Sequence, residues 1–143
     1  MMEVYKAQTK ADILQHLQVR GQVFIVEQGV SWLEECTPDD LDATHFNARV
    51  DGQVVGAARL LGNKIGRVAV LTDFRGQGVG AQLMAAIEQE AVLLGLQELA
   101  LGAQLPVILF YEQLGYKAYG DVFLDAQIEH RMMRKTLLAG GAS

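Results

Sequence analysis

The chain has few cysteines, few aromatic residues and no basic cluster, and each shortage excludes a class of protein. Cys36 is the only cysteine among 143 residues, so no internal disulfide can form and a reducing compartment is expected. One thiol and three scattered histidines do not give the spacing of a zinc site, so no metal is expected. Aromatic residues make up 7% of the chain, too few for an extensive stacking surface.

Long apolar runs and excess positive charge are also missing. Twelve Lys and Arg against seventeen Asp and Glu give a net charge of −5, which argues against nucleic acid as a partner and permits a cationic substrate such as an amine. The most apolar window, residues 93–110, is interrupted by polar residues and Pro106, so no membrane span is predicted. Residues 1–6 lack the pattern of a signal peptide. We therefore expect a soluble, cytoplasmic protein.

The length and composition are those of one globular domain. Half of the residues are apolar and a fifth are charged, enough to form a hydrophobic core without metals or disulfides. No repeat or linker divides the chain. We expect a single domain over residues 1–138 and a disordered tail over residues 139–143, which are small and Gly-rich.

The first third of the chain predicts a strand, a helix and an acidic loop. Residues 2–7 are typical of a short strand, and Thr9 with Asp12 resembles a capping box at a helix start. Ile13, Leu17 and Phe24 fall near one helix face, whereas His16 is expected on the solvated face. Residues 30–43 are interpreted as a solvated loop with about one helical turn, although its carboxylates could attract a cationic amine.

The remaining segments alternate between strands and helices. In residues 44–50, His45 and Asn47 face one way and Phe46 and Ala48 the other, which predicts a half-buried strand, and Asp51-Gly52 predicts a hairpin. Further strands are predicted at 53–61, 65–71, 97–103, 116–119 and 127–137, with helices ending near Gly95 and Gly115. The order β-α-β-β-β-α-β-α-β-β indicates an α+β or mixed α/β fold.

A glycine-rich loop follows the third strand of this series. Gly76, Gly78 and Gly80 precede a helix whose first N–H groups and positive dipole end form a natural phosphate or pyrophosphate site. The Walker pattern is excluded because Ala81 follows the last glycine, and the spacing differs from the dinucleotide fingerprint. A loop that only turns the chain is the alternative.

Two motifs make the chain resemble the GNAT acetyltransferase superfamily. The segment from Arg67-Val68-Ala69-Val70 to Arg75-x-x-Gly78-x-Gly80 resembles its coenzyme A motif, and Phe110 to Tyr116 resembles its second signature. The predicted element order matches that superfamily over essentially the whole chain. Residues 23–29, 43–45 and 103–104, with His130 and Met133, resemble the ElaA/YjcF-type bacterial branch.

The resemblance implies a central mixed, mostly antiparallel sheet flanked by helices, and a cleft opened by a β-bulge between strands 65–71 and 97–103. It implies that acetyl-CoA binds there as co-substrate, with the acetyl carbonyl polarised by the Val70 amide. Many family members carry Asn where this chain has Gln104. The residues implied to contact the cofactor are Val68, Ala69, Val70, Arg75, Gly76, Gln77, Gly78, Val79, Gly80, Ala81, Gln104 and Tyr111.

The resemblance also implies an N-acetyltransferase that acts on a primary amine of a small molecule or peptide. Tyr111 matches the residue that protonates the departing thiolate, although it could merely pack on the cofactor. Because no Ser-His-Asp pattern or activated cysteine is present, direct transfer in a ternary complex is favoured. The candidate bases are Glu27, Glu34, Glu35, His45 and His130, and water chains could replace them.

Two alternatives to an enzyme remain, a non-catalytic acyl-CoA-binding module and an interaction domain. The final strands also allow a homodimer.

Overall fold

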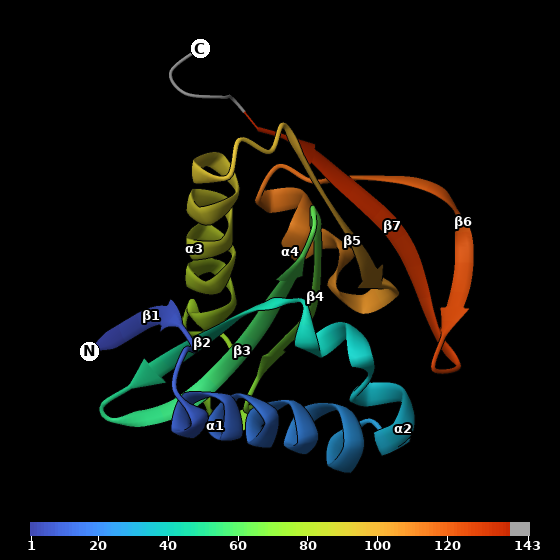
Figure 1. Cartoon of the computed structure of the whole chain (residues 1–143). Coiled ribbons are helices and arrows are strands. Elements are labelled where there is room, and N and C mark those ends of the chain that lie inside the picture. Colours follow the sequence, from blue (N-terminus) through green and yellow to red (C-terminus); the bar gives the residue numbers. More distant parts are fainter. Residues whose placement is uncertain (138–143) are drawn as a thin grey trace.

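The computed structural model describes residues 1–137, and the expected tail at 139–143 and the domain end at 138 lie outside the described residues. The predicted element order is confirmed (Figure 1). The strands are β1 (Met2–Lys6), β2 (Thr44–Val50), β3 (Gln53–Leu61), β4 (Lys64–Val70), β5 (Glu98–Gln104), β6 (Lys117–Asp125) and β7 (Ile128–Thr136). The helices are α1 (Lys10–Arg20), α2 (Trp32–Glu35), α3 (Val79–Leu93) and α4 (Ile108–Gln113), with short 3₁₀ turns at Pro38–Leu41, Thr72–Phe74 and Leu105–Val107.

The seven strands form one sheet in the order β1-β2-β3-β4-β5-β7-β6. All neighbours run antiparallel except β4 and β5, which are parallel, so the expected mixed, mostly antiparallel sheet is confirmed. The turn at Asp51-Gly52 has φ of 47° and 86°, as the predicted tight hairpin requires. Strand β6 extends to Asp125, well past the predicted end at residue 119.

Helices α1 and α3 cover opposite faces of the sheet (Figure 1). The large core contains Leu83 and Ile87 of α3, Phe46 of β2 and Leu101 of β5. The smaller core on the other face joins Val19 and Val23 to Ala57 and Ala69. The sheet is therefore covered on both sides, and its central strands are buried.

The expectation of a half-buried β2 is wrong, because α1 covers the face that carries its polar residues. His45 is 8% exposed and Asn47 is fully buried, whereas Phe46 faces the large core. His16, which was expected on a solvated helix face, is also fully buried. Its Nδ1 lies 3.2 Å from the Phe46 carbonyl and 3.1 Å from Asn47 Oδ1, so α1 packs on β2 through polar contacts.

The helix that begins with α1 changes its winding at Gly21. Its start is the predicted capping box, in which the Asp12 N–H donates to Thr9 Oγ1. Residues Gly21–Glu27 form a π-helix, in which the Gln28 N–H reaches back to the Val23 carbonyl. The 3.6-residue stripe that placed Phe24 on the α1 face therefore fails beyond Gly21, because wider turns rotate later side chains about the axis. Among residues 1–137, no helix is long and apolar enough to cross a membrane.

Candidate functional site

A cleft of about 740 Å³ opens where β4 and β5 part. These strands pair only at Lys64 with Ala100 and Ile65 with Leu101. Of the residues singled out from the sequence, the cleft is lined by Val68, Ala69, Val70, Arg75, Gly76, Gly78, Val79, Gly80, Ala81, Gln104, Tyr111 and His130, together with Glu34 and Glu35. Gln77, Glu27 and His45 are not among its lining residues.

A β-bulge in β4 accompanies the parting. Ala57 pairs with Ala69 and Arg59 pairs with Gly66, so Arg67 and Val68 together oppose a single residue of β3. Arg67 has a φ of 54°, in the left-handed region that residues other than glycine seldom adopt. Such a bulge bends its strand and increases the local twist, which turns the end of β4 away from β5.

The exposed edge of β4 presents backbone groups to the cleft. The Leu71 N–H donates to the Val55 carbonyl of β3 at 2.9 Å. Because backbone groups alternate along an antiparallel strand, the N–H and C=O of Val70 point the other way, toward the parted edge. The Val70 carbonyl accepts a hydrogen bond from Arg75 Nε at 2.8 Å. The Val70 N–H is then the group at this position available to a ligand.

The glycine-rich loop places the start of α3 at the cleft. Gly76 and Gly78 have φ of 73° and 85°, and Gly78 is the N-cap residue of α3. The first intrahelical bond runs from Gln82 to Gly78, which leaves the N–H groups of Val79, Gly80 and Ala81 without helical partners. A Cβ on Gly80 would lie 3.2 Å from the Phe110 ring, so glycine also permits close packing here. Free N–H groups at the positive end of a 15-residue helix form an anion site.

Arg75 and Glu27 form a two-pronged ion pair beside this loop. Arg75 Nη1 and Nη2 donate to the two Glu27 carboxylate oxygens at 2.7 Å each, and Thr72 Oγ1 donates to Glu27 at 3.2 Å. The hydrogen bonds from Arg75 lower the pKa of Glu27. A carboxylate held in this way is a poor acceptor for an amine proton, and Arg75 uses its side chain to hold the loop.

Tyr111 lies in the wall of the cleft, 7% exposed. Its ring packs edge-on against Phe110 and Tyr116, with centroids 5.0 and 6.1 Å away. Burial raises the pKa of the Tyr111 phenol well above its usual value. The hydroxyl is therefore protonated at neutral pH and can donate a hydrogen bond or a proton to a group with developing negative charge.

His130 is held in one tautomer by its own strand. Its Nδ1 lies 2.6 Å from the Ile128 carbonyl, which can only accept, so Nδ1 carries the hydrogen. In the neutral ring Nε2 is then a free base. The ring stacks on Phe123, with centroids 5.6 Å apart, and His130 pairs with Gln104 across β7 and β5. Gln104 donates to Gln28 Oε1 at 2.9 Å.

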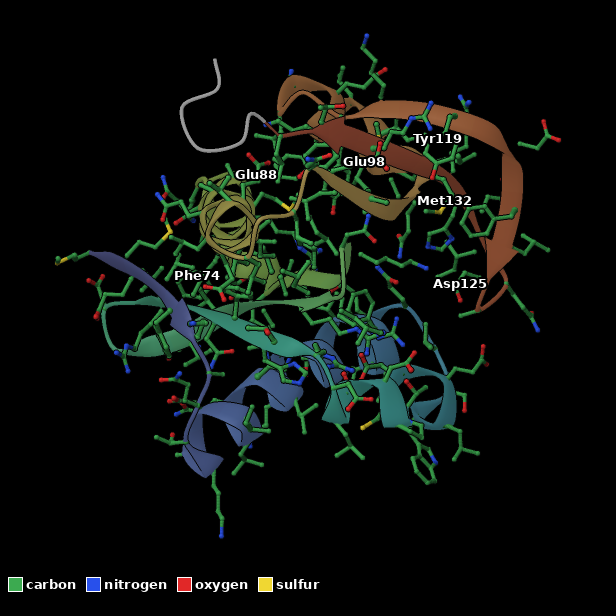
Figure 2. The ribbon with its side chains drawn as sticks, turned by 45° about the horizontal axis from the view of Figure 1, so that its top comes forward. Phe74, Glu88, Glu98, Tyr119, Asp125 and Met132 are labelled. Carbon is green, nitrogen blue, oxygen red and sulfur yellow. The ribbon has the colours of Figure 1, made fainter. Side chains whose placement is uncertain are left out.

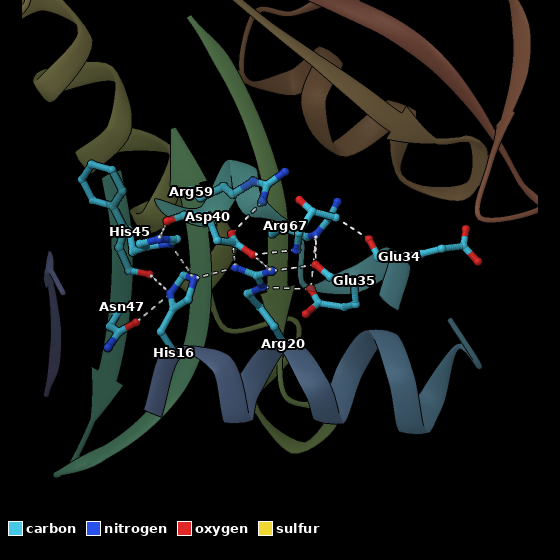
Figure 3. Close-up of polar contacts among 11 residues, drawn as sticks. His16, Arg20, Glu34, Glu35, Asp40, His45, Asn47, Arg59 and Arg67 are labelled. Atoms are coloured by element: carbon cyan, nitrogen blue, oxygen red, sulfur yellow. Dashed lines mark hydrogen bonds and ion pairs between the residues drawn. The ribbon is translucent and has the colours of Figure 1, made fainter. Parts of the chain in front are cut away.

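His45 lies outside the cleft, in a buried polar cluster between α1 and the sheet (Figure 3). Its Nδ1 lies 3.1 Å from His16 Nε2, and its Nε2 lies 2.8 Å from the Asp40 carbonyl. Burial lowers the pKa of His16 to about 4, so His16 is neutral. With both ring nitrogens engaged, His45 is placed to support structure and not to take a proton from a substrate.

The acidic segment has the expected helical turn at Trp32–Glu35 and is exposed at Glu34, Asp39 and Asp42, but Glu35 and Asp40 are not solvated as expected. Glu35 is 3% exposed and accepts from Arg20 Nε at 2.8 Å. Asp40 accepts from Arg20 at 2.8 and 3.0 Å and from Arg59 at 2.6 Å. Two of the carboxylates that were considered as attractors for an amine are therefore neutralised by arginines.

Nothing in the sequence singled out Arg20, Arg59 or the side chain of Arg67. Arg20 lies four residues after His16, which puts both on one helix face, but two polar residues at that spacing suggest a solvated face.

Within residues 1–137, no group of three His, Cys, Asp or Glu side chains is arranged to hold a metal ion.

The β6–β7 hairpin forms the far side of the cleft. Asp125 marks the tip of this hairpin, which faces the part of the molecule that carries α2 (Figure 2). The turn residues Ala126 and Gln127 adopt φ of 50° and 64° without glycine. The cleft thus runs from the glycine-rich loop to a second end between α2 and this hairpin.

Comparison with known proteins connects this geometry to a family. The family model of the acetyltransferase (GNAT) domain matches residues 9–137. The chain is 32% identical over 139 residues to the uncharacterized N-acetyltransferase YjcF of Bacillus subtilis, covering 94% of this chain and 99% of that protein. It is 30% identical over 143 residues to the uncharacterized protein YyaT of the same organism, covering 95% and 97%.

Solved structures agree with these matches. An acyl-CoA N-acyltransferase from Pseudomonas aeruginosa has a TM-score of 0.81 and 33% identity, covering 94% of this chain and 98% of that one. Escherichia coli ElaA has a TM-score of 0.83 and 28% identity, covering 94% and 99%. A putative N-acetyltransferase from Lactobacillus plantarum has a TM-score of 0.87 and 26% identity, covering 96% and 99%.

Proposed function

The chain belongs to the GNAT acetyltransferase family, in the branch of ElaA and YjcF, and from this premise we propose that it moves the acetyl group of acetyl-CoA directly to a primary amine of a small molecule or peptide. Family membership implies acyltransferase activity and the fold of acyl-CoA N-acyltransferases. One observation carries the finer proposal: a single cleft joins the free N–H groups at the start of α3, the parted edge of β4 and the Tyr111 phenol.

The residues of the cleft fit acetyl-CoA. The N–H groups of Val79, Gly80 and Ala81 suit a pyrophosphate, and positive φ at Gly76 and Gly78 lets the loop backbone approach it. The edge at residues 68–70 suits the peptide-like pantetheine arm, which can extend a sheet. The Val70 N–H would hold the acetyl oxygen and stabilise negative charge that develops on it.

The remaining groups suit the proton transfers. An amine nitrogen forms a bond to the acetyl carbon, the carbon–sulfur bond breaks, and the amine proton goes to His130 Nε2 or to water. Tyr111 donates its phenolic proton toward the leaving thiolate. His130 Nε2 is suited to its step because the Ile128 carbonyl holds the hydrogen on Nδ1. Neither Glu27, paired with Arg75, nor His45, outside the cleft, is retained as a base in this proposal.

Three wider expectations stay with the proposal. Residues 1–138 act as one domain, the protein works in the cytoplasm, and β6, which lies at the edge of the sheet beside β7, offers an edge through which two copies could pair. Gln77 is retained only as part of the loop, because its side chain donates to the Asp73 carbonyl at 3.2 Å.

The first test is calorimetric titration of the full chain with acetyl-CoA, CoA and NAD, followed by an amine panel with detection of released thiol. Micromolar binding of the CoA forms, no binding of NAD and amine-dependent thiol release would support the proposal. Binding without turnover of any amine would favour the non-catalytic module. Absence of CoA binding would refute the proposal and favour an interaction domain.

A further inference from the structure

Three arginines and two carboxylates form a cluster between α1, α2 and the sheet (Figure 3). Arg20, fully buried, makes five hydrogen bonds, one from each N–H of its guanidinium. Its partners are His16 Nε2, both carboxylate oxygens of Asp40, and a carboxylate oxygen and the carbonyl of Glu35. Arg20 therefore has no capacity left for a ligand.

The other two arginines differ, because both line the cleft and both retain free donors. Arg59 donates from Nη1 to Asp40 at 2.6 Å, and its other N–H groups have no partner among the described residues. Arg67 donates from Nε to the Glu35 carbonyl at 3.1 Å and from Nη2 to the Glu34 carbonyl at 3.0 Å, while Nη1 has no partner there. Their side chains are 10% and 22% exposed, so these donors are held within the cleft wall.

The cluster also carries unbalanced charge. Three guanidinium groups face two carboxylates, those of Glu35 and Asp40, and His16 is neutral. Burial, and then repulsion from Arg59 and Arg20, lowers the pKa of Arg67. Buried cations in excess are costly unless an anion joins them.

Neighbouring carboxylates do not supply that anion. The Glu34 side chain is exposed and extends away from Arg67 (Figure 3). Asp39 and Asp125 also line the cleft, but both are exposed and neither forms an ion pair with Arg59 or Arg67, and Lys64, also exposed there, adds a positive charge. A ligand carboxylate would offset positive charge at Arg59 and Arg67 and could accept hydrogen bonds from both arginines.

We propose that the acceptor amine carries a carboxylate, as an amino acid does, and that Arg59 and Arg67 bind this carboxylate at the end of the cleft away from the glycine-rich loop. This inference rests on the proposed acetyl transfer. Asp40 and Glu35 hold the two guanidinium groups in place, and Arg20 in turn holds Asp40 and Glu35. The cluster is thus a preorganised site, in which little side-chain freedom remains to be lost on binding.

The test compares matched amines with saturating acetyl-CoA. Each of a set of L-amino acids is paired with its C-terminal amide, which keeps the side chain and removes the charge, and ethanolamine phosphate represents a phosphate-bearing amine. Thiol release gives kcat/KM for the wild type, Arg59→Gln and Arg67→Gln. Arg49→Gln is the matched control, because Arg49 pairs with Glu3 at 3.5 Å and does not line the cleft. Acetyl-CoA affinity shows that each variant is folded.

We expect the best amino acid to exceed its amide by about 10- to 100-fold in the wild type, the range for a charge-assisted hydrogen bond or two. This ratio should fall at least tenfold in Arg59→Gln and Arg67→Gln and persist in Arg49→Gln. The free carboxylate makes the neighbouring amine more basic and less available, so a preference for the amino acid must come from binding.

Three results would overturn the inference. The amides could have kcat/KM equal to or higher than that of their amino acids, or the ratio of amino acid to amide could persist in both Arg59→Gln and Arg67→Gln. Ethanolamine phosphate could also have a higher kcat/KM than every amino acid. Titration of the N-acetylated amino acids and amides, with and without CoA, reads the site without turnover. If acetyl-CoA binds but the carboxylates bind no better than the amides, the inference fails and the proposed function stands. If acetyl-CoA does not bind, the proposed function fails, and the titration without CoA decides the carboxylate site.

Discussion

Replacement of Arg20 by Met tests whether the buried cluster is held together by charge. The change removes a fully buried guanidinium and its five hydrogen bonds but keeps an unbranched side chain of similar length. It leaves Glu35 and Asp40, whose side chains are 3% and 12% exposed, without their shared cation, and each keeps one other arginine, Arg67 at 3.2 Å and Arg59 at 2.6 Å. Removing one partner of a buried ion pair costs about 3–5 kcal/mol. Against a total stability of about 5–15 kcal/mol, this is a large loss.

Urea unfolding followed by circular dichroism measures the loss in free energy of unfolding directly. In thermal unfolding, Tm should fall by roughly 10 °C. Trp32 is a poor reporter for this purpose because it is 66% exposed. The control is Arg49→Met, which removes a partly exposed ion pair with Glu3 and should cost less than about 1 kcal/mol. A loss below about 1 kcal/mol for Arg20→Met would refute the reasoning.

The same variant has a defined pH dependence. Burial alone would raise the pKa of Asp40, but hydrogen bonds from Arg20 and Arg59 lower it well below the usual range. Because the pKa of Asp40 is lower in the folded state than the value of about 3.9 in the unfolded state, its ionised form stabilises the fold at pH values above about 3.9. This contribution is lost as the pH falls toward the folded-state pKa. The stability gap between the wild type and Arg20→Met should therefore be widest near neutral pH and narrow toward pH 3. A gap that widens in acid would contradict the assignment.

Three further predictions concern the cleft and the core. Gly78→Glu should abolish measurable acetyl-CoA binding, whereas Gly78→Asn, in which asparagine tolerates the φ of 85°, should bind acetyl-CoA within about tenfold of the wild type. If calorimetry gives Gly78→Glu the same acetyl-CoA affinity as the wild type, the loop is not part of the cofactor site. Tyr111→Phe should lower kcat about 100-fold with little change in acetyl-CoA affinity, and an unchanged kcat would leave Tyr111 as a packing residue. Gly56→Ala should lower the free energy of unfolding by about 1–3 kcal/mol, because the new Cβ would lie 2.8 Å from Val79 Cγ1. Gly21→Ala, where the Cβ meets open space and φ is already helical, should raise it by about 0.4–1 kcal/mol, and urea unfolding measures both changes.

The sequence was sufficient for features that depend on local residue chemistry. The capping box at Thr9, the Asp51-Gly52 turn and the start of a helix after Gly78 each follow from residues adjacent in the chain. The element order follows from periodicity in the same way. These signals are strong because backbone geometry restricts which residues can occupy such positions.

Features that depend on distant partners were not predicted. The polar face of β2 looked solvated because nothing in residues 44–50 reveals that α1 covers it. Glu35 and Asp40 looked like part of a solvated loop because their partners, Arg20 and Arg59, lie well apart from them in the sequence. The full length of β6 was missed because its hairpin turns at Ala126 and Gln127 without glycine.

The π-helix was missed for a different reason. A hydrophobic stripe at a period of 3.6 residues assumes α-helical winding, and Gly21–Glu27 departs from that winding although no proline marks the change. The consequence for the site is direct, because Phe24 and Gln28 line the cleft and Gln28 meets Gln104 there.

The narrow join between β4 and β5 has a mechanical consequence. The sheet consists of two groups of hydrogen-bonded strands, β1–β4 and β5–β7. Between the two groups, only the residues near Lys64–Ile65 and Ala100–Leu101 are paired. A change in the angle between the two groups would alter the width of the cleft and break few backbone hydrogen bonds within either group. The backbone hydrogen bonds of the sheet are therefore fewest along the line where the two substrates would have to meet, and the core side chains of α3, which pack on strands of both groups, hold the two groups together there.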